Sequence, residues 1–436
     1  MCGFLFTNKK VEDISYVNEF LKFRGPDSTN KVNNNGYTFV HNLLSITGEF
    51  TTQPMIDNDI VCLFNGEIYN YKDCGDEWDN DSEILIPLYK EMGVNFIKYL
   101  DGEFALTLID FKKQILIVST DTFSTKPLWM SINGDKVGTS SYRSCLDRLN
   151  FQNVTKLPAN TTNIYSLEDM KLLETFTPFT FDINQHKKTY DDWIIAFEES
   201  IRKRSQGVRE NIFLGLSSGY DSGAISNELN KQNVSFNAYT IMSEENFNII
   251  HERSELVKNH NKIYLKSTEY DSAKNYLSKN CEDFIYDGYD IKGDKASNGL
   301  SHICKLAIQD GCKIYMSGQG ADEILSDYGH NGRKIYNHSG FGGLFPSSLN
   351  NFFPWHSFYD GTQIKYLNKE EYVASSYGIE TRYPFLDKFL VQEFLWLDYS
   401  LKNKQYKAPL TEYLNRNNFP FDSGVKIGFR ADSNLK

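Results

Sequence analysis

The fold of the second half of the chain is indicated by the stretch Ile212-Phe213-Leu214-Gly215-Leu216-Ser217-Ser218-Gly219-Tyr220-Asp221-Ser222-Gly223-Ala224. Its mainly apolar start, residues 212–216, predicts a buried strand, and a turn of small residues leads into a helix through Ala224, Ile225 and Leu229. Such a turn lets backbone N–H groups approach a phosphate, and the dipole of the following helix adds to the attraction. The lysine of a Walker A loop and the spacing of a dinucleotide fingerprint are absent. An ordinary strand-to-helix turn is the alternative interpretation.

The surrounding sequence repeats this alternation of strand and helix. Strands are predicted at 238–242 and 312–316, and apolar residues at helical spacing predict a helix over 193–201. Helices that separate consecutive strands are typical of a parallel, doubly wound α/β sheet.

The first part of the chain has a different pattern. Short strand-like runs at 37–40, 60–64 and 114–118 are separated by turn signals, and a helix is predicted at 81–91. This pattern predicts an α+β domain with antiparallel sheets. The polar segment 180–188 lacks any such pattern, so we interpret it as a linker and place the two domains at 1–185 and 186–436.

Length and composition exclude several classes of protein. The 436 residues exceed one ordinary core, and the net charge of −11 argues against a general nucleic-acid binder. No apolar run reaches the ~18–20 residues that span a bilayer, and the N-terminus turns polar at Thr7, too early for a signal peptide. The seven cysteines show no metal-binding spacing, so we expect free thiols in a reducing cytoplasm.

Cys2 is the one cysteine whose position suggests chemistry. We expect Met1 to be removed, which would place a thiol beside a free α-amine. An α-amine has a pKa of about 7.7–8 and can serve as the base for a thiol, as in N-terminal nucleophile enzymes. The alternative is a cysteine without function at the second position.

A series of motifs follows Cys2 in a fixed order: Arg24-Gly25-Pro26-Asp27, His41 with Leu44-Ser45-Ile46, Gln53-Pro54-Met55, Asn65-Gly66-Glu67-Ile68-Tyr69-Asn70, Asp81-Ser82-Glu83-Ile84, Asp101-Gly102-Glu103-Phe104-Ala105 and Lys126-Pro127-Leu128. Together they closely resemble the glutaminase domain of class II glutamine amidotransferases of the asparagine synthetase family. The resemblance implies an N-terminal nucleophile hydrolase sandwich of αββα layers.

The same resemblance implies a role for each matching residue. Cys2 would attack the carboxamide of glutamine, the Asn65 side chain and Gly66 N–H would form the oxyanion hole, and Glu67 and Asp81 would hold the α-amino group. A tight turn is the alternative for Asn65-Gly66. The sequence departs from the family at Leu43, where an arginine usually pairs with the α-carboxylate of glutamine.

The second domain resembles the ATP pyrophosphatase domain of the same family. The loop at 216–224 matches its Ser-Gly-Gly-x-Asp-Ser motif with Ser218 at the first glycine, and three more segments match further family motifs, namely Ser317-Gly318-Gln319-Gly320-Ala321-Asp322-Glu323, Tyr377-Gly378-Ile379-Glu380-Thr381-Arg382-Tyr383-Pro384-Phe385-Leu386-Asp387 and Lys426-Ile427-Gly428-Phe429. The resemblance implies an ATP site formed by Leu216, Ser217, Gly219, Asp221, Ser222, Ile241, Met242, Ser317 and Gly318.

The resemblance also implies Mg²⁺ ligands and a phosphate-neutralising lysine. Asp221 and Asp322 would bind Mg²⁺, and Lys407 would neutralise charge on the reacting phosphates. The alternatives are acidic residues at a solvated helix start and a surface lysine.

Gln319 is a second departure from the family, which usually has a glutamate here. A glutamine is neutral and cannot act as a base, and β-lactam synthetases have a tyrosine at this place. We include Gln319 among the catalytic residues and interpret it as a sign of an unusual acceptor. Glu371-Tyr372, where Asp-Arg is usual, and Thr411, where arginine is common, lie in the same half of the chain.

The leading hypothesis is a glutamine-dependent amidotransferase that uses ATP and Mg²⁺. It would adenylate a carboxylate, aspartate by default, and convert it to an amide with ammonia from glutamine. The alternatives are a paralogue that amidates a sugar, peptide or metabolite, a β-lactam-synthetase-like cyclase, and a non-catalytic descendant. The expected partners are small molecules, without nucleic acid or membrane, and the resemblance is compatible with a homodimer.

Overall fold

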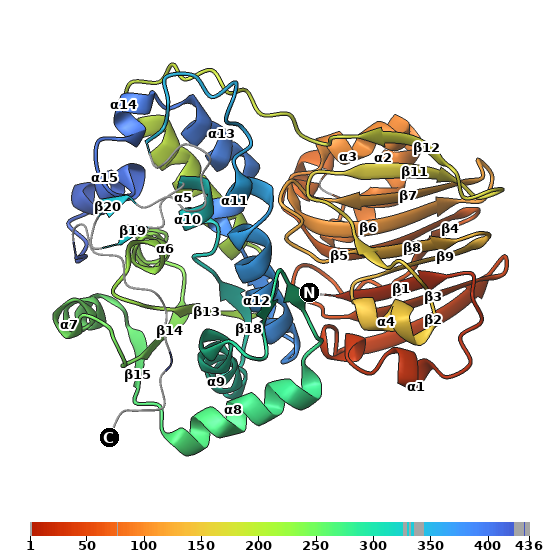
Figure 1. Cartoon of the computed structure of the whole chain (residues 1–436), viewed down its shortest axis with the longest axis horizontal. Helices are drawn as coiled ribbons and strands as arrows, with labels where there is room; N and C mark the ends of the chain where they lie inside the picture. Colours follow the sequence, from red (N-terminus) through yellow and green to blue (C-terminus); the bar gives the residue numbers. More distant parts are fainter. Residues whose placement is uncertain are drawn as a thin grey trace.

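Two bodies lie side by side in the computed structural model, which describes residues 2–75, 77–325, 344–422 and 431, and the backbone of 329–330 and 333–334. The two six-stranded antiparallel sheets use strands up to residue 176, and the parallel sheet begins at residue 211 (Figure 1). The predicted change of fold class along the chain is therefore confirmed. The start of β1 lies on the side of the first body that faces the second (Figure 1).

The first body contains two six-stranded antiparallel sheets. In spatial order, the first sheet consists of β10 (Thr155–Lys156), β8 (Trp129–Asn133), β9 (Lys136–Ser140), β1 (Gly3–Thr7), β3 (Tyr37–Leu43) and β2 (Ser28–Asn34). The second consists of β12 (Leu172–Phe176), β11 (Thr162–Ser166), β7 (Ile115–Thr120), β6 (Gly102–Asp110), β5 (Ile60–Ile68) and β4 (Met55–Asp57).

Side-chain alternation explains why these sheets stack between helices. Successive residues of a strand point to opposite faces, and in β5 Val61 and Leu63 pack against the first sheet. The intervening Cys62 and Phe64 pack outward against the helices α2 (Leu85–Met92) and α3 (Phe96–Tyr99). With α1 (Ile14–Val17) and α4 (Arg143–Arg148) covering the first sheet, the layers are αββα, as expected. The helix predicted at 81–91 is a 3-10 turn, η3 (Asp81–Ile84), that continues into α2.

The second body is built on a five-stranded parallel sheet. Its spatial order is β15 (Asn259–Ile263), β14 (Phe236–Ile241), β13 (Asn211–Gly215), β18 (Cys312–Met316) and β21 (Glu380–Arg382). Ile212 and Leu214 pack on one face against α5 (Asp191–Ser205), α6 (Tyr220–Lys231), α13 (Lys388–Trp396) and α15 (Ala408–Arg416). Phe213 packs on the other against α8 (Ser267–Asn280), α9 (Lys295–Gln309) and α12 (Thr362–Ser375). The doubly wound sheet is confirmed.

Shorter elements complete the described part of the chain. The helices are α7 (Phe247–Leu256), α10 (Ala321–Leu325), α11 (His356–Tyr359) and α14 (Tyr399–Lys402), and the 3-10 turns are η1 (Leu21–Phe23), η2 (Tyr71–Cys74), η4 (Gly93–Asn95) and η5 (Pro384–Leu386). The two-residue strands are β16 (Ile285–Tyr286), β17 (Tyr289–Asp290), β19 (Gly329–His330) and β20 (Arg333–Lys334). Over the described ranges, no helix combines the length and the apolar character that crossing a membrane requires.

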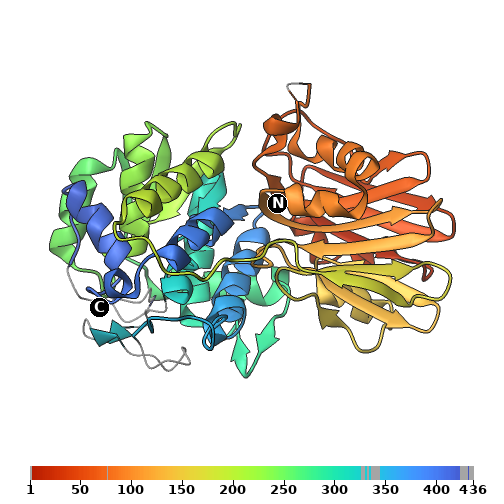
Figure 2. The same ribbon diagram turned by 90° about the horizontal axis from the view of Figure 1, so that it is seen from above.

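The segment between the two bodies contains the predicted linker. Residues 177–190 form neither a helix nor a strand, apart from an isolated bridge between Lys187 and Leu397. Figure 2 shows this segment running along the second body before α5 begins. Phe181 is buried there among residues of both bodies, so the segment is packed against the protein rather than free in solvent. The boundary at residue 185 stays a prediction.

Candidate functional site

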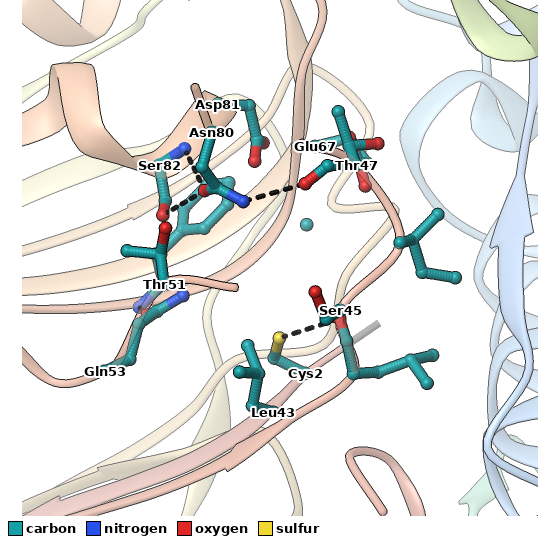
Figure 3. A pocket seen from close by; sticks show the side chains of 14 residues that line it. Cys2, Leu43, Ser45, Thr47, Thr51, Gln53, Glu67, Asn80, Asp81 and Ser82 are labelled. Carbon is teal, nitrogen blue, oxygen red and sulfur yellow. Dashed lines mark hydrogen bonds between the residues drawn. The ribbon is translucent and has the colours of Figure 1, made fainter. Parts of the chain in front are cut away.

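Cys2 lies directly before β1, at the bottom of a pocket in the first body (Figure 3). The thiol is 3.9 Å from the carbonyl oxygen of Leu44, and the backbone nitrogen of Cys2 donates to Asn65 Oδ1 at 2.9 Å. The structure therefore brings together two predicted residues that are far apart in the sequence. The residue is only 5% exposed, and burial raises the pKa of the Cys2 thiol to about 11. The thiol is therefore protonated at neutral pH and needs a base to become a nucleophile.

Asn65 and Gly66 form part of β5 rather than a turn. They pair with Ala105 and Phe104 of β6, so the tight-turn interpretation is wrong. Gly66 has φ +143°, and a Cβ atom there would lie 1.9 Å from the carbonyl oxygen of Glu103, so only glycine fits. The strand reaches from the second sheet to Cys2 and ends in the pocket.

The Asn65 side chain has the geometry of a prepared hydrogen-bond donor. Its Oδ1 is occupied by the Cys2 nitrogen, whereas Nδ2 is buried and has no hydrogen-bond partner among the described residues. A buried donor without a partner is costly unless a ligand satisfies it. The position beside Cys2 fits a donor to an oxyanion formed at the carbon that the thiol attacks.

Two buried carboxylates lie across the pocket from Cys2 (Figure 3). Asp81, at the start of η3, accepts a hydrogen bond from the Ile68 N–H at 2.8 Å, and burial raises its pKa to about 7. Glu67 lies 2.9 Å from Arg382 Nη2, and burial holds the pKa of Glu67 well above its ordinary value. Both carboxylates are placed where they can face an amine in the pocket.

The loop at 216–223 follows β13 and leads into α6, as predicted. Ser217 Oγ and Ser222 Oγ are 2.9 Å apart, and the Gly219 N–H donates to Ser217 Oγ at 3.1 Å. The guanidinium group of Arg253 donates to the Ser217 carbonyl and would overlap a Cβ atom at Gly223. These contacts hold a compact turn in front of the N-terminus of α6, which is the geometry that a phosphate group needs.

Three residues from distant motifs meet beside this loop. Lys407 Nζ lies 2.7 Å from both carboxylate oxygens of Asp221 and 2.8 Å from Asp322 Oδ1. Lys407 is only 2% exposed, so the surface-lysine interpretation is wrong, and the two acids hold its pKa well above the ordinary value despite burial. Its backbone is left-handed, with φ 43°, a conformation that non-glycine residues rarely adopt outside constrained sites. A Cβ atom at Gly318 would lie 3.0 Å from Asp221 Cβ, which places the second motif at the same point.

The residues predicted to frame adenosine lie at one edge of the parallel sheet. Leu216, Ile241 with Met242, and Ser317 end or follow β13, β14 and β18, which are neighbours in the sheet. The carboxyl ends of adjacent parallel strands form the usual ligand crevice of such sheets. Asp221 and Asp322 could supply oxygen ligands to Mg²⁺, which commonly uses one or two carboxylates together with substrate phosphates. The motif Lys426-Ile427-Gly428-Phe429 lies outside the described residues.

Sequence reasoning assigned no role to a buried ionic network that joins the two bodies. Arg24 donates to the Cys2 carbonyl at 2.8 Å and pairs with Glu371 of α12 at 2.8 Å. The network continues through the pairs Lys126–Glu371, Arg204–Glu103, Arg204–Asp387 and Arg382–Glu67. Arg24 and Glu103 belong to quoted motifs, but the charge partners of Arg24 and Arg204 are more than 100 residues away, so no local pattern reveals the pairing.

The adjacent Glu370 was also missed. It accepts a hydrogen bond from Ser317 Oγ, which in turn accepts one from the Gln319 N–H at 3.0 Å. Glu371 therefore faces the first body, whereas Glu370 faces the second nucleotide motif, and both belong to α12. Thr411 donates to the Tyr406 carbonyl at 2.7 Å within the buried start of α15.

The αββα body with a cysteine at position 2, joined to a doubly wound domain, defines a two-domain glutamine amidotransferase. Residues 1–176 match the family described as "Glutamine amidotransferase domain", and residues 194–360 match the family described as "Asparagine synthase". With both halves matched in this order, the chain contains a glutamine amidotransferase domain followed by an asparagine synthase domain, and it is similar to glutamine-hydrolysing asparagine synthetases.

Individual relatives are distant. A putative glutamine-hydrolysing asparagine synthetase of Methanocaldococcus jannaschii is 26% identical over 81% of this chain and 68% of its own length. A probable asparagine synthetase of Schizosaccharomyces pombe is 25% identical over 91% of this chain and 76% of its own length. Among solved structures, a glutamine phosphoribosylpyrophosphate amidotransferase from B. subtilis is 17% identical, with a TM-score of 0.33, over 49% of this chain and 60% of that one.

Proposed function

We propose that this chain hydrolyses glutamine in the first body and uses the ammonia to amidate an ATP-activated carboxylate in the second. The observation that carries the proposal is that Cys2, Gly66, Glu67 and Asp81 line one pocket and that Asn65 bonds to the Cys2 nitrogen, although these residues come from three separate segments. A nucleophile, an unpartnered buried amide donor and two carboxylates are the groups that amide hydrolysis and amine recognition require.

In the first body, Cys2 Sγ attacks the γ-carbonyl carbon of glutamine while its proton passes to the α-amine that removal of Met1 exposes. The Asn65 amide and the Gly66 N–H stabilise the oxyanion. The C–N bond breaks and the nitrogen takes up the proton, so that ammonia leaves and a thioester remains. Water then hydrolyses the thioester to glutamate and restores the thiol.

In the second body, the acceptor carboxylate attacks the α-phosphorus of ATP, and pyrophosphate leaves. Lys407 stabilises the negative charge that develops on the phosphates. Mg²⁺, held by Asp221 and Asp322, would neutralise phosphate charge when bound. Ammonia then attacks the acyl carbon of the adenylate, loses a proton and displaces AMP, which leaves the amide.

The proposed acceptor is aspartate, in line with the names of the relatives. A different carboxylate is the second candidate, because Gln319 offers a neutral amide whose buried Nε2 has no hydrogen-bond partner among the described residues. Such a donor suits an acceptor with a neutral or anionic oxygen at this position and cannot remove a proton. We also propose a cytoplasmic enzyme, since all seven cysteines are free thiols, and a homodimer, which size-exclusion chromatography with light scattering would test.

The decisive experiment follows glutamate and pyrophosphate with ATP, Mg²⁺ and either glutamine or ammonia, in the presence of aspartate or other carboxylates. Cys2→Ala is expected to abolish the glutamine-dependent reaction and to preserve the ammonia-dependent one. Cys74→Ala changes a half-buried cysteine away from the pocket and is the matched control. This variant is expected to preserve both the glutamine-dependent and the ammonia-dependent reaction. Glutamine-dependent turnover by Cys2→Ala would refute the nucleophile, and pyrophosphate release that aspartate does not stimulate would refute aspartate as the acceptor.

A further inference from the structure

The pocket around Cys2 is lined by acidic side chains and by no cationic side chain. All fourteen lining residues are described, and they include Glu67 and Asp81 but no lysine, arginine or histidine (Figure 3). The other lining groups that can form hydrogen bonds are neutral, for example Thr47 and Gln53. Apart from the α-amine of Cys2 that the proposed mechanism uses as the base, a ligand therefore meets acidic side chains at one side of the pocket and only uncharged side chains elsewhere.

The nearest arginine does not change this balance. Arg382 is 1% exposed, and its guanidinium group contacts Glu67 at 2.9 Å and Glu380 at 2.8 Å. It also donates to the Arg204 carbonyl at 2.9 Å and lies 3.4 Å from Thr47 Oγ1. Because these contacts occupy each nitrogen of its planar fork, Arg382 cannot turn toward a carboxylate in the pocket without breaking a buried ion pair.

Leu43 occupies the wall of the pocket beside Cys2, opposite the two carboxylates (Figure 3). It is the last residue of β3 and is 8% exposed. An apolar side chain here offers no hydrogen bond to a charged group, and burying a carboxylate against it without a counter-ion is unfavourable. The γ-carboxamide and the α-amine of the amide donor have partners in the pocket, whereas its α-carboxylate meets no cationic side chain there.

We propose that Leu43 is a specificity-determining residue that removes selection for a free α-carboxylate, so that glutamine derivatives with a neutral α-carboxyl group are amide donors at least as good as free glutamine. This rests on the proposed glutaminase function. The donor class consists of glutamine with a free α-amine whose carboxyl group is held in an amide, as in glutamine α-amide.

The test uses the full chain and measures ammonia release from glutamine, glutamine α-amide and Nα-acetylglutamine at pH 7. The expected kcat/KM for glutamine α-amide equals or exceeds that for glutamine. Nα-acetylglutamine, which lacks the cation that Glu67 and Asp81 would hold, is expected to be at least about ten-fold poorer than either. A lower kcat/KM for glutamine α-amide than for glutamine overturns the inference.

A variant gives an independent measurement. Leu43→Arg is expected to shift the ratio of kcat/KM for glutamine over glutamine α-amide by about ten-fold or more in favour of glutamine, the effect of one charge-assisted contact. Leu43→Met, of similar volume and without charge, leaves the ratio unchanged. An unchanged ratio in a folded Leu43→Arg overturns the inference, and if this variant does not fold, the donor series on the unaltered chain decides.

The same series separates this inference from the proposed function. Hydrolysis of glutamine in preference to its α-amide contradicts only the role of Leu43. Failure to hydrolyse any of the three donors contradicts the glutaminase activity itself, and with it the inference.

Discussion

Replacing Lys407 with methionine tests the charge balance of the second site. In the structure, one buried ammonium group lies 2.7 Å from an oxygen of Asp221 and 2.8 Å from an oxygen of Asp322. The methionine variant keeps most of the side-chain volume and removes the charge. Asp221 and Asp322 are then two mostly buried carboxylates that repel each other.

The size of the effect follows from the geometry. Both oxygens lie within hydrogen-bond distance of the same nitrogen, so they are at most about 5.5 Å apart, and two unit charges at that distance repel by about 3 kcal/mol at an effective dielectric constant of about 20. We therefore expect Lys407→Met to lose about that much free energy of unfolding near pH 7. Mg²⁺ is expected to recover part of the loss, because in the proposed site it would bind the folded state between the same two acids.

The pH dependence has a definite sign. Without the ammonium group, repulsion raises the pKa of the carboxyl pair above the unfolded value of about 4, so the folded variant binds more protons than the unfolded chain. The loss in free energy of unfolding that Lys407→Met causes therefore grows as the pH rises through this range, and it shrinks in acid. In the unaltered chain the pKa of Lys407 is raised, so its stabilisation is present at neutral pH and is lost only above the unfolded lysine pKa of about 10.4.

The assay is thermal and urea unfolding of the unaltered chain, Lys407→Met and the exposed control Lys404→Met, each with and without Mg²⁺. Lys407→Met should be the least stable without Mg²⁺ and should gain the most from it, and pyrophosphate release should fall strongly in this variant alone. Equal stability of all three proteins, or equal stabilisation by Mg²⁺, would show that the two carboxylates do not share the lysine as described.

Three further predictions concern the first body and the interface. Gly66→Ala should cost about 3 kcal/mol or more of stability, since its Cβ would lie 1.9 Å from the Glu103 carbonyl oxygen, and a variant with unchanged urea unfolding contradicts this. Glu371→Ala should cost about 3–5 kcal/mol because it leaves Arg24 buried without its partner, whereas Glu371→Gln should cost less; equal losses in the two variants would count against the ion pair. For Asp81, with a pKa of about 7, kcat/KM for glutamine should fall as the pH drops below that value, since protonation removes the charge that faces the amine; a profile that stays flat there, measured beside the ammonia-dependent reaction, contradicts the assignment.

The residues that sequence reasoning located well are those whose signals are local. The strand and helix around the loop at 216–223 follow from apolar periodicity and small turn residues, and both appear as β13 and α6. Cys2 was singled out by its position, and the motifs that follow it suggested its role. The order of the motifs then predicted that Asp221, Asp322 and Lys407 meet, which the structure confirms. Their roles stay predictions.

Other features could not be predicted because they depend on the conformation and environment of each residue. Asn65-Gly66 has the composition of a turn, yet pairing with β6 holds it in an extended strand. Glu371 lies in the half of the chain that should recognise the acceptor, but its side chain is buried against Arg24, 347 residues away in the sequence. A charge inside a protein is stable only with a partner, and no periodicity or spacing identifies a partner at that separation.

The sequence by itself determined the succession of an antiparallel and a parallel domain and located the candidate nucleophile and the candidate phosphate loop, because alternation, turn chemistry and motif order are properties of short segments. Only the tertiary structure decided the electrostatics of the two sites. It placed one lysine between two aspartates, and it lined the Cys2 pocket with two acids, Leu43 and no cationic side chain. The physical reason is that burial and the distance between charges, rather than residue type, set the energy of an ionised group.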